Sequence, residues 1–232
     1  MNFFGKRVLF LGAHPDDIEL GCGALLHHIV NQTDVLCVTL SDNQRNPELQ
    51  DVKGEHFESM AVLGVPKDKI IFGPFTTRIF PDSRQDILEY FLKIRKDFDP
   101  DLIFIHSKQD VHQDHNTMTD EALRAFRGIT VLGFDVVRSS YGFFPHFLVE
   151  VTEEDVKKKI EALSKYETYR DRYYFNSELT RSIWFATARW QNVHLRRGLI
   201  FCGSWEILGT ANKKRLPWNI KFYTRNSSIV RK

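Results

Sequence analysis

The sequence predicts an α/β fold with a mostly parallel sheet and helices on both faces, and three observations indicate it. Short continuous apolar runs, such as residues 7–12 and 102–105, are typical of strands buried on both faces. Between these runs, apolar residues recur at the three- and four-residue spacing of helices. Polar residues follow the runs directly, as expected where strands end at a ligand-binding edge. Parallel neighbours are joined by helical crossovers, so this alternation favours a parallel sheet.

The expected elements alternate regularly through the first 130 residues. Strands are expected at 7–12, 34–40, 69–72 and 102–105, and helices at 18–32, 51–63, 84–98 and 116–127. The pattern then weakens, with strands expected at 134–137 and 147–151, helices at 153–169 and 181–197, and a segment of uncertain type at 199–207. A chain of 232 residues suits one domain. We expect residues 1–130 to form its βα core and residues 131–232 to close a cleft.

Charge and composition exclude several classes of function. Lysine and arginine total 32 and aspartate and glutamate 30, so no strong field favours nucleic acid or anionic lipid. The cysteines are odd in number and show no CxxC or clustered spacing. This argues against a disulfide framework or a cysteine zinc site and is compatible with a reducing cytosol. No apolar stretch approaches the roughly 20 residues of a membrane helix, and the N-terminus lacks signal-peptide features. We expect a soluble cytoplasmic protein with no membrane span.

The 19 phenylalanines indicate an aromatic-rich core. The alternative is that those in the last third cover a partner subunit, which leaves a homo-oligomer open, or line a cleft.

Two polar motifs follow expected strands and lie about a hundred residues apart. His14-Pro15-Asp16-Asp17 comes directly after the first strand, and His112-Gln113-Asp114-His115 comes after the fourth. Arg45 lies in the loop after the second strand. Because the carboxyl ends of parallel strands meet at one edge of the sheet, we expect these loops to converge there.

The residue types in the two motifs indicate a metal-dependent hydrolase. Catalytic zinc takes three protein ligands and leaves a position for water, whose proton a carboxylate that is not a ligand can accept. Successive side chains of an extended segment point in opposite directions, so one of Asp16 and Asp17 can bind the metal while the other faces the water. One of His112 and His115 can complete the ligand set and the other can donate a proton. Asp114 would orient a histidine.

Each motif alone is also compatible with a polar surface turn, so the prediction depends on the pair. His106 is expected to be a wall residue at a strand end, and Asp110 a capping carboxylate. Gly21 and Gly23 favour close packing of a helix on a strand; the alternative, a phosphate cradle, lacks the Lys-Ser/Thr of a P-loop. The remaining histidines are expected to be ordinary helix residues: His27, His28, His56 and His194.

The sequence Ala13-His14-Pro15-Asp16-Asp17, followed by Glu19-Leu20-Gly21-Cys22-Gly23 and later by His112-x-Asp114-His115, resembles the PIG-L/LmbE superfamily of zinc-dependent de-N-acetylases. The specific motifs cover residues 7–24 and 99–125, with looser agreement from 34 to 170. The resemblance implies a Rossmann-like three-layer αβα sandwich.

The resemblance also implies a role for each motif residue. Zinc, or another divalent metal such as Fe²⁺, would be bound by His14, Asp17 and His115. Asp16 would be the general base, and His112, oriented by Asp114, would stabilise the tetrahedral intermediate and act as acid. The implied substrates are N-acetylated amino sugars carrying a nucleotide, lipid, inositol or malate group, and the products are acetate and a free amine.

The sequence departs from the family pattern at two places. The family commonly has an acid directly after the second aspartate, whereas here Ile18 intervenes before Glu19. The arginine common in the second helix is replaced by Val52-Lys53-Gly54, so Arg45 or Lys53 is the candidate substrate contact. Two alternatives stay open. One is hydrolysis of a larger or formyl amide linked to a sugar by the same residues. The other is a doubly wound nucleotide-binding or regulatory protein whose two motifs are incidental and which binds no stoichiometric zinc.

Overall fold

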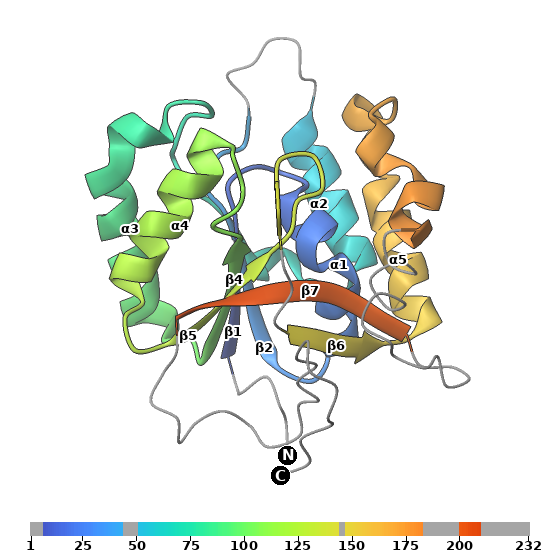
Figure 1. Ribbon diagram of the computed structural model, residues 1–232, viewed down its shortest axis with the longest axis horizontal. Coiled ribbons are helices and arrows are strands. Elements are labelled where there is room, and N and C mark those ends of the chain that lie inside the picture. Colours follow the sequence, from blue (N-terminus) through green and yellow to red (C-terminus); the bar gives the residue numbers. More distant parts are fainter. Residues whose placement is uncertain (1–6, 44–50, 144–146, 183–199, 210–232) are drawn as a thin grey trace.

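One seven-stranded sheet, in the order β3-β2-β1-β4-β5-β7-β6, forms the centre of the computed structural model (Figure 1). The structure describes residues 7–43, 51–143, 147–182 and 200–209. The first five strands in this order, from β3 through β2, β1 and β4 to β5, pair in parallel. Strand β7 is antiparallel to both β5 and β6. The strands are β1 (Arg7–Gly12), β2 (Asp34–Thr39), β3 (Ile70–Phe72), β4 (Leu102–His106), β5 (Thr130–Phe134), β6 (Phe147–Val151) and β7 (Ile200–Gly209).

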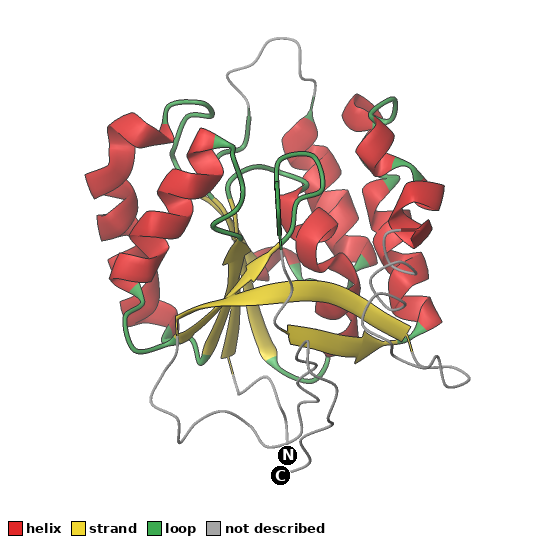
Figure 2. Cartoon of the chain, in the orientation of Figure 1, coloured by secondary structure: helices red, strands yellow, loops and turns green. Residues whose placement is uncertain are grey.

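Helices cover both faces of the sheet, which confirms the predicted α/β sandwich (Figure 2). On one face α3 packs against α4, and on the other α5 packs against α1 and α2. The helices are α1 (Asp17–Ile29), α2 (Val52–Val62), α3 (Arg84–Phe98), α4 (Gln113–Ala125) and α5 (Glu153–Leu163), with short 3-10 turns at Lys67–Lys69, Phe80–Ser83, Glu167–Tyr169 and Tyr173–Phe175. In the described part of the chain, no helix combines the length and the apolar character that a membrane crossing requires.

Successive side chains of β1 point to opposite faces of the sheet and so contribute to both halves of the core. Val8 and Phe10 face the cluster that includes α1, whereas Leu9 and Leu11 face the cluster that includes α3 and α4. All four are fully buried. The continuous apolar run was therefore a correct indicator of a central strand covered on both sides.

Several expected elements are confirmed and several are corrected. The strands at 7–12 and 147–151 and the helix at 84–98 have the bounds that the sequence indicates. The strand expected at 134–137 is wrong, because β5 pairs with β4 from Thr130 onward and ends at Phe134. The helix expected at 153–169 ends at Leu163, followed by a turn and a 3-10 segment. The segment of uncertain type at 199–207 contributes to β7, and the helix expected at 181–197 lies almost wholly outside the described residues.

The start of α4 is a further correction with consequences for the site. The sequence indicates a helix from residue 116, but α4 begins at Gln113, because the His112 side chain caps it by accepting a hydrogen bond from the backbone amide of Asp114. Asp114 and His115 therefore lie in the first turn of a helix, where their side chains are held more rigidly than in a loop.

Gly21 confirms the interpretation that this part of α1 packs closely on a strand. A Cβ atom added at Gly21 would collide with the ring of Phe134 in β5. At Gly23 an added Cβ would lie 3.1 Å from Cγ of Lys159, on a flexible side chain.

We predict that Gly21→Ala lowers the free energy of unfolding by about 1–3 kcal/mol, because the ring of Phe134 is fully buried and has no room to move. Gly23→Ala is the matched control on the same helix. It should be neutral or stabilising, because Ala is favoured over Gly in helices. Urea denaturation measures both, and equal effects of the two substitutions would contradict the packing argument.

Candidate metal centre

The two motifs meet at the carboxyl edge of the sheet because β1 and β4 are parallel neighbours. His14 and Asp17 follow β1, and His115 lies in the first turn of α4. His14 Nδ1 is 3.3 Å from His115 Nε2, and each of these atoms is 3.5 Å from Asp17 Oδ2. Three potential ligand atoms thus form a nearly equilateral triangle. All three side chains are buried.

Asp110 determines which nitrogen of His115 is available. Its Oδ2 is 2.8 Å from His115 Nδ1 and also accepts a hydrogen bond from Ser139 Oγ at 2.9 Å. The Nδ1 proton therefore points to the carboxylate, and the lone pair of Nε2 points into the triangle. Burial and the nearby His106 lower the pKa of His115 to about 3, so its imidazole is neutral.

Asp114 determines which ring nitrogen of His14 is available, whereas the resemblance implies that Asp114 orients His112. Asp114 Oδ2 is 2.9 Å from His14 Nε2, which leaves His14 Nδ1 in the triangle. The same carboxylate accepts hydrogen bonds from the backbone amides of Arg78 and Phe80 at 2.5 and 3.2 Å. Its contact with His112 goes through the backbone, because the ring of the capping His112 accepts the Asp114 amide at 3.2 Å.

Asp17 is an ionised carboxylate with one free oxygen. Burial alone would raise its pKa, but the neighbouring His115 and His106 hold it well below the usual range. Its Oδ2 accepts the His14 backbone amide at 2.8 Å, whereas its Oδ1 is buried without a hydrogen-bond partner. A buried polar atom without a partner is costly, and here it lies on a residue of the triangle. The Asp17 carboxylate, Nε2 of the neutral His115, and Nδ1 of His14 after loss of a proton are a donor set that fits a divalent metal.

Asp16 occupies a strained backbone position beside the triangle. It is the N-terminal cap of α1, but its φ of 96° is left-handed and its side chain makes no capping hydrogen bond. Such a conformation costs about 1–3 kcal/mol in a residue other than Gly and is typical of functional sites. Burial and the adjacent Asp17 raise the pKa of Asp16 well above the usual range. The adjacent acids thus differ sharply in proton affinity.

Arg138 contributes to this site although the sequence analysis did not single it out. Its positive charge lowers the pKa of Asp16 and so offsets part of the effect of burial. The guanidinium lies 5.5 Å from the centre of the Tyr174 ring, and the Nε atom is buried without a hydrogen-bond partner. The signal available in the sequence was its position directly after the strand expected at 134–137.

His112 lies over the triangle and is partly exposed. Its ring stacks on His115 at 4.4 Å between centroids and lies 5.0 Å from that of His14. Burial and the charge of His14 lower the pKa of His112, so the ring is neutral near pH 7. Since Nδ1 accepts a backbone amide, the ring proton lies on Nε2.

His106 lies behind the triangle and Asp110 beside it. His106 is fully buried at the end of β4, and its Nε2 is 3.3 Å from Asp17 Oδ2 but already accepts the Ala13 amide at 3.2 Å. It could replace His14 in a ligand group with Asp17 and His115. That amide contact argues for the wall position that the sequence indicates.

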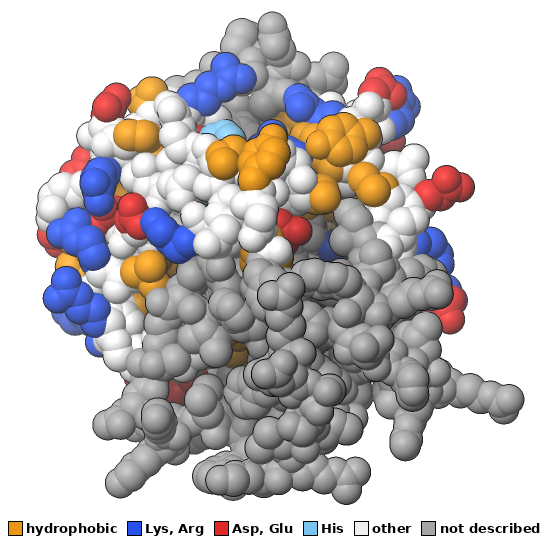
Figure 3. Space-filling model, in the orientation of Figure 1, with side chains coloured by type: hydrophobic (Ala, Val, Ile, Leu, Met, Phe, Trp, Pro, Cys, Tyr) orange, Lys and Arg blue, Asp and Glu red, His pale blue; other side chains and the backbone are white. Residues whose placement is uncertain are grey.

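The two candidate substrate contacts, Arg45 and Lys53, are not part of the triangle formed by His14, Asp17 and His115. Arg45 lies outside the described residues, and Lys53 pairs with Asp42 at 3.3 Å. Hydrophobic side chains gather beside a histidine on the face of the molecule seen in Figure 3; the exposed Val111 precedes His112 directly.

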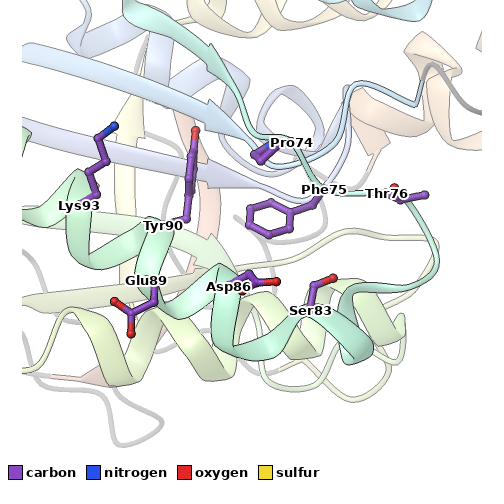
Figure 4. A pocket seen from close by; sticks show the side chains of 8 residues that line it. All are labelled: Pro74, Phe75, Thr76, Ser83, Asp86, Glu89, Tyr90 and Lys93. Atoms are coloured by element: carbon purple, nitrogen blue, oxygen red, sulfur yellow. The ribbon is translucent and has the colours of Figure 1, made fainter.

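A hollow of about 510 Å³ lies between α3 and the loop after β3, and it contains no residue of the cluster (Figure 4). It is lined by Pro74, Phe75, Thr76, Ser83, Asp86, Glu89, Tyr90 and Lys93.

Fold and site together define an α/β protein with a buried His–Asp cluster at the carboxyl edge of its sheet. The PIG-L family model, described as GlcNAc-PI de-N-acetylase, matches residues 9–126, just over half of the 232 residues. The chain belongs to this deacetylase family. It is 27% identical over 169 residues to "Uncharacterized deacetylase YaiS" of Escherichia coli, covering 70% of this chain and 91% of that protein.

Solved structures share the fold at lower identity. N,N'-diacetylchitobiose deacetylase from Pyrococcus horikoshii superposes with a TM-score of 0.62 at 18% identity, covering 88% of this chain and 84% of that one. GalB, the 4-carboxy-2-hydroxymuconate hydratase of Pseudomonas putida, superposes with a TM-score of 0.68 at 15% identity, covering 91% and 100%. The same fold therefore carries more than one reaction.

We predict that Asp110→Asn weakens zinc binding about 10- to 100-fold, because the carboxylate orients His115 and fixes its tautomer. Competition with a chelator measures the affinity. Asp120→Asn is the matched control on α4, because Asp120 is partly exposed and pairs with Lys108 instead of a residue of the two motifs. Equal zinc affinity in the two variants would contradict the role assigned to Asp110.

We also predict that zinc binding releases one proton. Burial would lower the pKa of His14, but hydrogen bonds to Asp114 and Asp17 outweigh it and raise the pKa to about 9. Below that pH the metal must displace a proton, so apparent zinc affinity should rise with pH, by up to tenfold per unit, and level off near pH 9. Titration calorimetry in buffers of different ionisation enthalpy counts the protons. A proton count of zero at pH 7 would refute the prediction.

Proposed function

We propose that the protein is a zinc-dependent hydrolase that removes an N-acetyl group from an amino sugar or sugar conjugate. One observation carries the proposal: the ligand atoms of His14, Asp17 and His115 form a triangle with sides of 3.3–3.5 Å next to the buried Asp16. Two histidines and a carboxylate are a known ligand set of catalytic zinc. A tetrahedral ion about 2.1 Å from each ligand requires ligand atoms about 3.4 Å apart.

Zinc in such a site polarises a carbonyl oxygen and lowers the pKa of a water molecule to about 7. Asp16 takes the proton as the water attacks the acetyl carbon, since its raised pKa makes it a stronger base than an ordinary aspartate. As the C–N bond breaks, the same proton passes from Asp16 to the leaving nitrogen. Asp17, whose pKa is lowered, stays ionised throughout.

His112 serves as the hydrogen-bond donor to the oxyanion. Its Nδ1 is occupied by the Asp114 amide, so Nε2–H is the group that can donate. With a lowered pKa the ring is neutral, which suits donation of a hydrogen bond better than transfer of a proton to the amine. Proton delivery to the nitrogen is therefore assigned to Asp16, and Asp114 supports His14.

The substrate class is inferred from the relatives. The family description names an N-acetylglucosamine lipid, and the chitobiose deacetylase acts, by its name, on an N-acetylated disaccharide. Arg45, which lies between β2 and α2 in the sequence, or Lys53, in the first turn of α2, is the proposed substrate contact. The partner is then a small sugar-linked molecule.

The test is a screen for amine and acetate release from N-acetyl sugars, nucleotide sugars and glycolipid headgroups by zinc-loaded protein. Formyl and larger acyl analogues distinguish deacetylation from a different amide hydrolysis. An unsaturated hydroxy acid probes the hydratase alternative that GalB raises. Purified protein that holds no stoichiometric metal and restores none after chelation and zinc addition would refute the proposal.

We predict that Asp16→Asn retains zinc but lowers turnover by about 10²–10⁴-fold, the usual contribution of a general base. Asn tolerates the left-handed backbone at this position, so the substitution removes the base without adding strain. His115→Ala should instead lose zinc. Metal content and initial rates measure both, and full turnover by the Asp16 variant would overturn the assignment of the base.

A further inference from the structure

A second buried polar cluster lies under the first turn of α1 and takes no part in the proposed reaction. The fully buried Glu19 accepts a hydrogen bond from Tyr166 Oη at 2.6 Å through its Oε1, and His56 Nδ1 lies 3.0 Å from the same oxygen. Tyr166 Oη is also 2.7 Å from His56 Nδ1. The cluster joins α1, α2 and the turn after α5.

The hydrogen-bond directions in this cluster are determined by its donors. Tyr166 has one proton, which it donates to Glu19. His56 Nε2 faces Thr39 Oγ1 at 3.4 Å, so the hydroxyl can donate to Nε2 while Nδ1–H points to the carboxylate. The two donors, Tyr166 Oη and His56 Nδ1, thus converge on one oxygen of the buried Glu19 carboxylate and hold it in place.

Glu19 is three residues after Asp16 and two after Asp17, within the same helical turn. Ile18 packs into the apolar core, and Glu19 reaches the polar cluster. Two anchors of opposite character at successive positions fix the rotation of this turn about the helix axis. Such external support is needed, because the left-handed backbone of Asp16 persists only where its surroundings impose it.

The cluster also extends towards the second motif. The ring of Tyr166 stacks on that of Tyr169 with 5.8 Å between centroids. Tyr169 Oη accepts a hydrogen bond from Asn43 Nδ2 at 3.3 Å, and Asn43 Oδ1 accepts one from Thr77. Thr77 directly precedes Arg78, whose amide holds Asp114.

We propose that Glu19 is a positioning residue: held by Tyr166 and His56, it fixes the first turn of α1 and thereby sets the carboxylates of Asp16 and Asp17 relative to the histidines. The proposal rests on the metal site of the proposed function. It explains why the displaced acid after Asp16-Asp17 suits this chain, since one extra residue rotates it to the side where α2 and the turn after α5 supply donors.

The test compares Tyr166→Phe, Glu19→Gln and the double variant in the full chain. Each single variant should bind zinc about tenfold more weakly in chelator competition, the size of effect that outer supporting groups have at metal sites. The double variant should lose no more zinc affinity than the weaker-binding single variant, because Glu19 and Tyr166 act as a unit. Tyr90→Phe on α3, at the hollow of Figure 4 and away from the cluster, is the matched control and should bind zinc as tightly as the unchanged protein.

Circular dichroism and thermal unfolding show whether each variant is folded at the temperature of the zinc titration. A purely structural cluster would lower the melting temperature and leave the zinc affinity of the folded protein unchanged, which would overturn the proposal. A loss of zinc affinity in the double variant equal to the product of the two single-variant losses would also overturn the proposal. If the unchanged protein binds no zinc, the metal site and the positioning role both fail, whereas tight binding with unaffected variants refutes the positioning role alone.

Discussion

The parallel pairing of β1 with β4 is the constraint on which the site depends. Val8 lies opposite Leu102 and Phe10 opposite Phe104, so the two strands end together and their following loops leave the sheet side by side. This register places His14 beside His115 although 101 positions separate them. The core on the α1 face of the sheet supports this register, since Phe10 and Phe104 stack there at 5.0 Å between centroids. A slip of one residue would turn these rings to the other face and separate the motifs.

Because the site is buried, electrostatic interactions determine the protonation states of its acids and the tautomers of its histidines. In a region of low dielectric each carboxylate requires donors, and each histidine is held in one tautomer by the donor or acceptor that it meets. Asp110 and Asp114 take one nitrogen each of His115 and His14 and leave the other nitrogens facing Asp17. The neighbouring His115 and His106 hold the pKa of Asp17 well below its usual range despite burial, whereas burial and the adjacent Asp17 raise the pKa of Asp16. Two adjacent aspartates thereby acquire different chemistry.

Much of this arrangement follows from the sequence. The runs that form β1 and β4 and the placement of polar motifs after them predicted where the site lies. The partner of Asp114 was not predictable, because it depends on His112 capping α4 and drawing the helix start back to Gln113. Arg138 was missed because its influence on Asp16 depends on an interaction between residues far apart in the chain, which local sequence does not encode. His56, expected to be an ordinary helix residue, acquires its role only from Glu19 and Tyr166, which lie far from it in the chain.

The fold alone leaves the reaction undecided, since a hydratase and a sugar deacetylase share it with this chain. Which reaction the site supports depends on the groups that can transfer protons. An amide nitrogen is a poor leaving group until it is protonated, so a deacetylase requires a group that first accepts a proton from water and then delivers it. Asp16, buried, strained and of raised pKa, is suited to both steps, whereas Asp17 is held ionised by His106 and His115. The support of α1 by Glu19 belongs to the same argument, because a base that transfers a proton twice must keep its place between the two transfers.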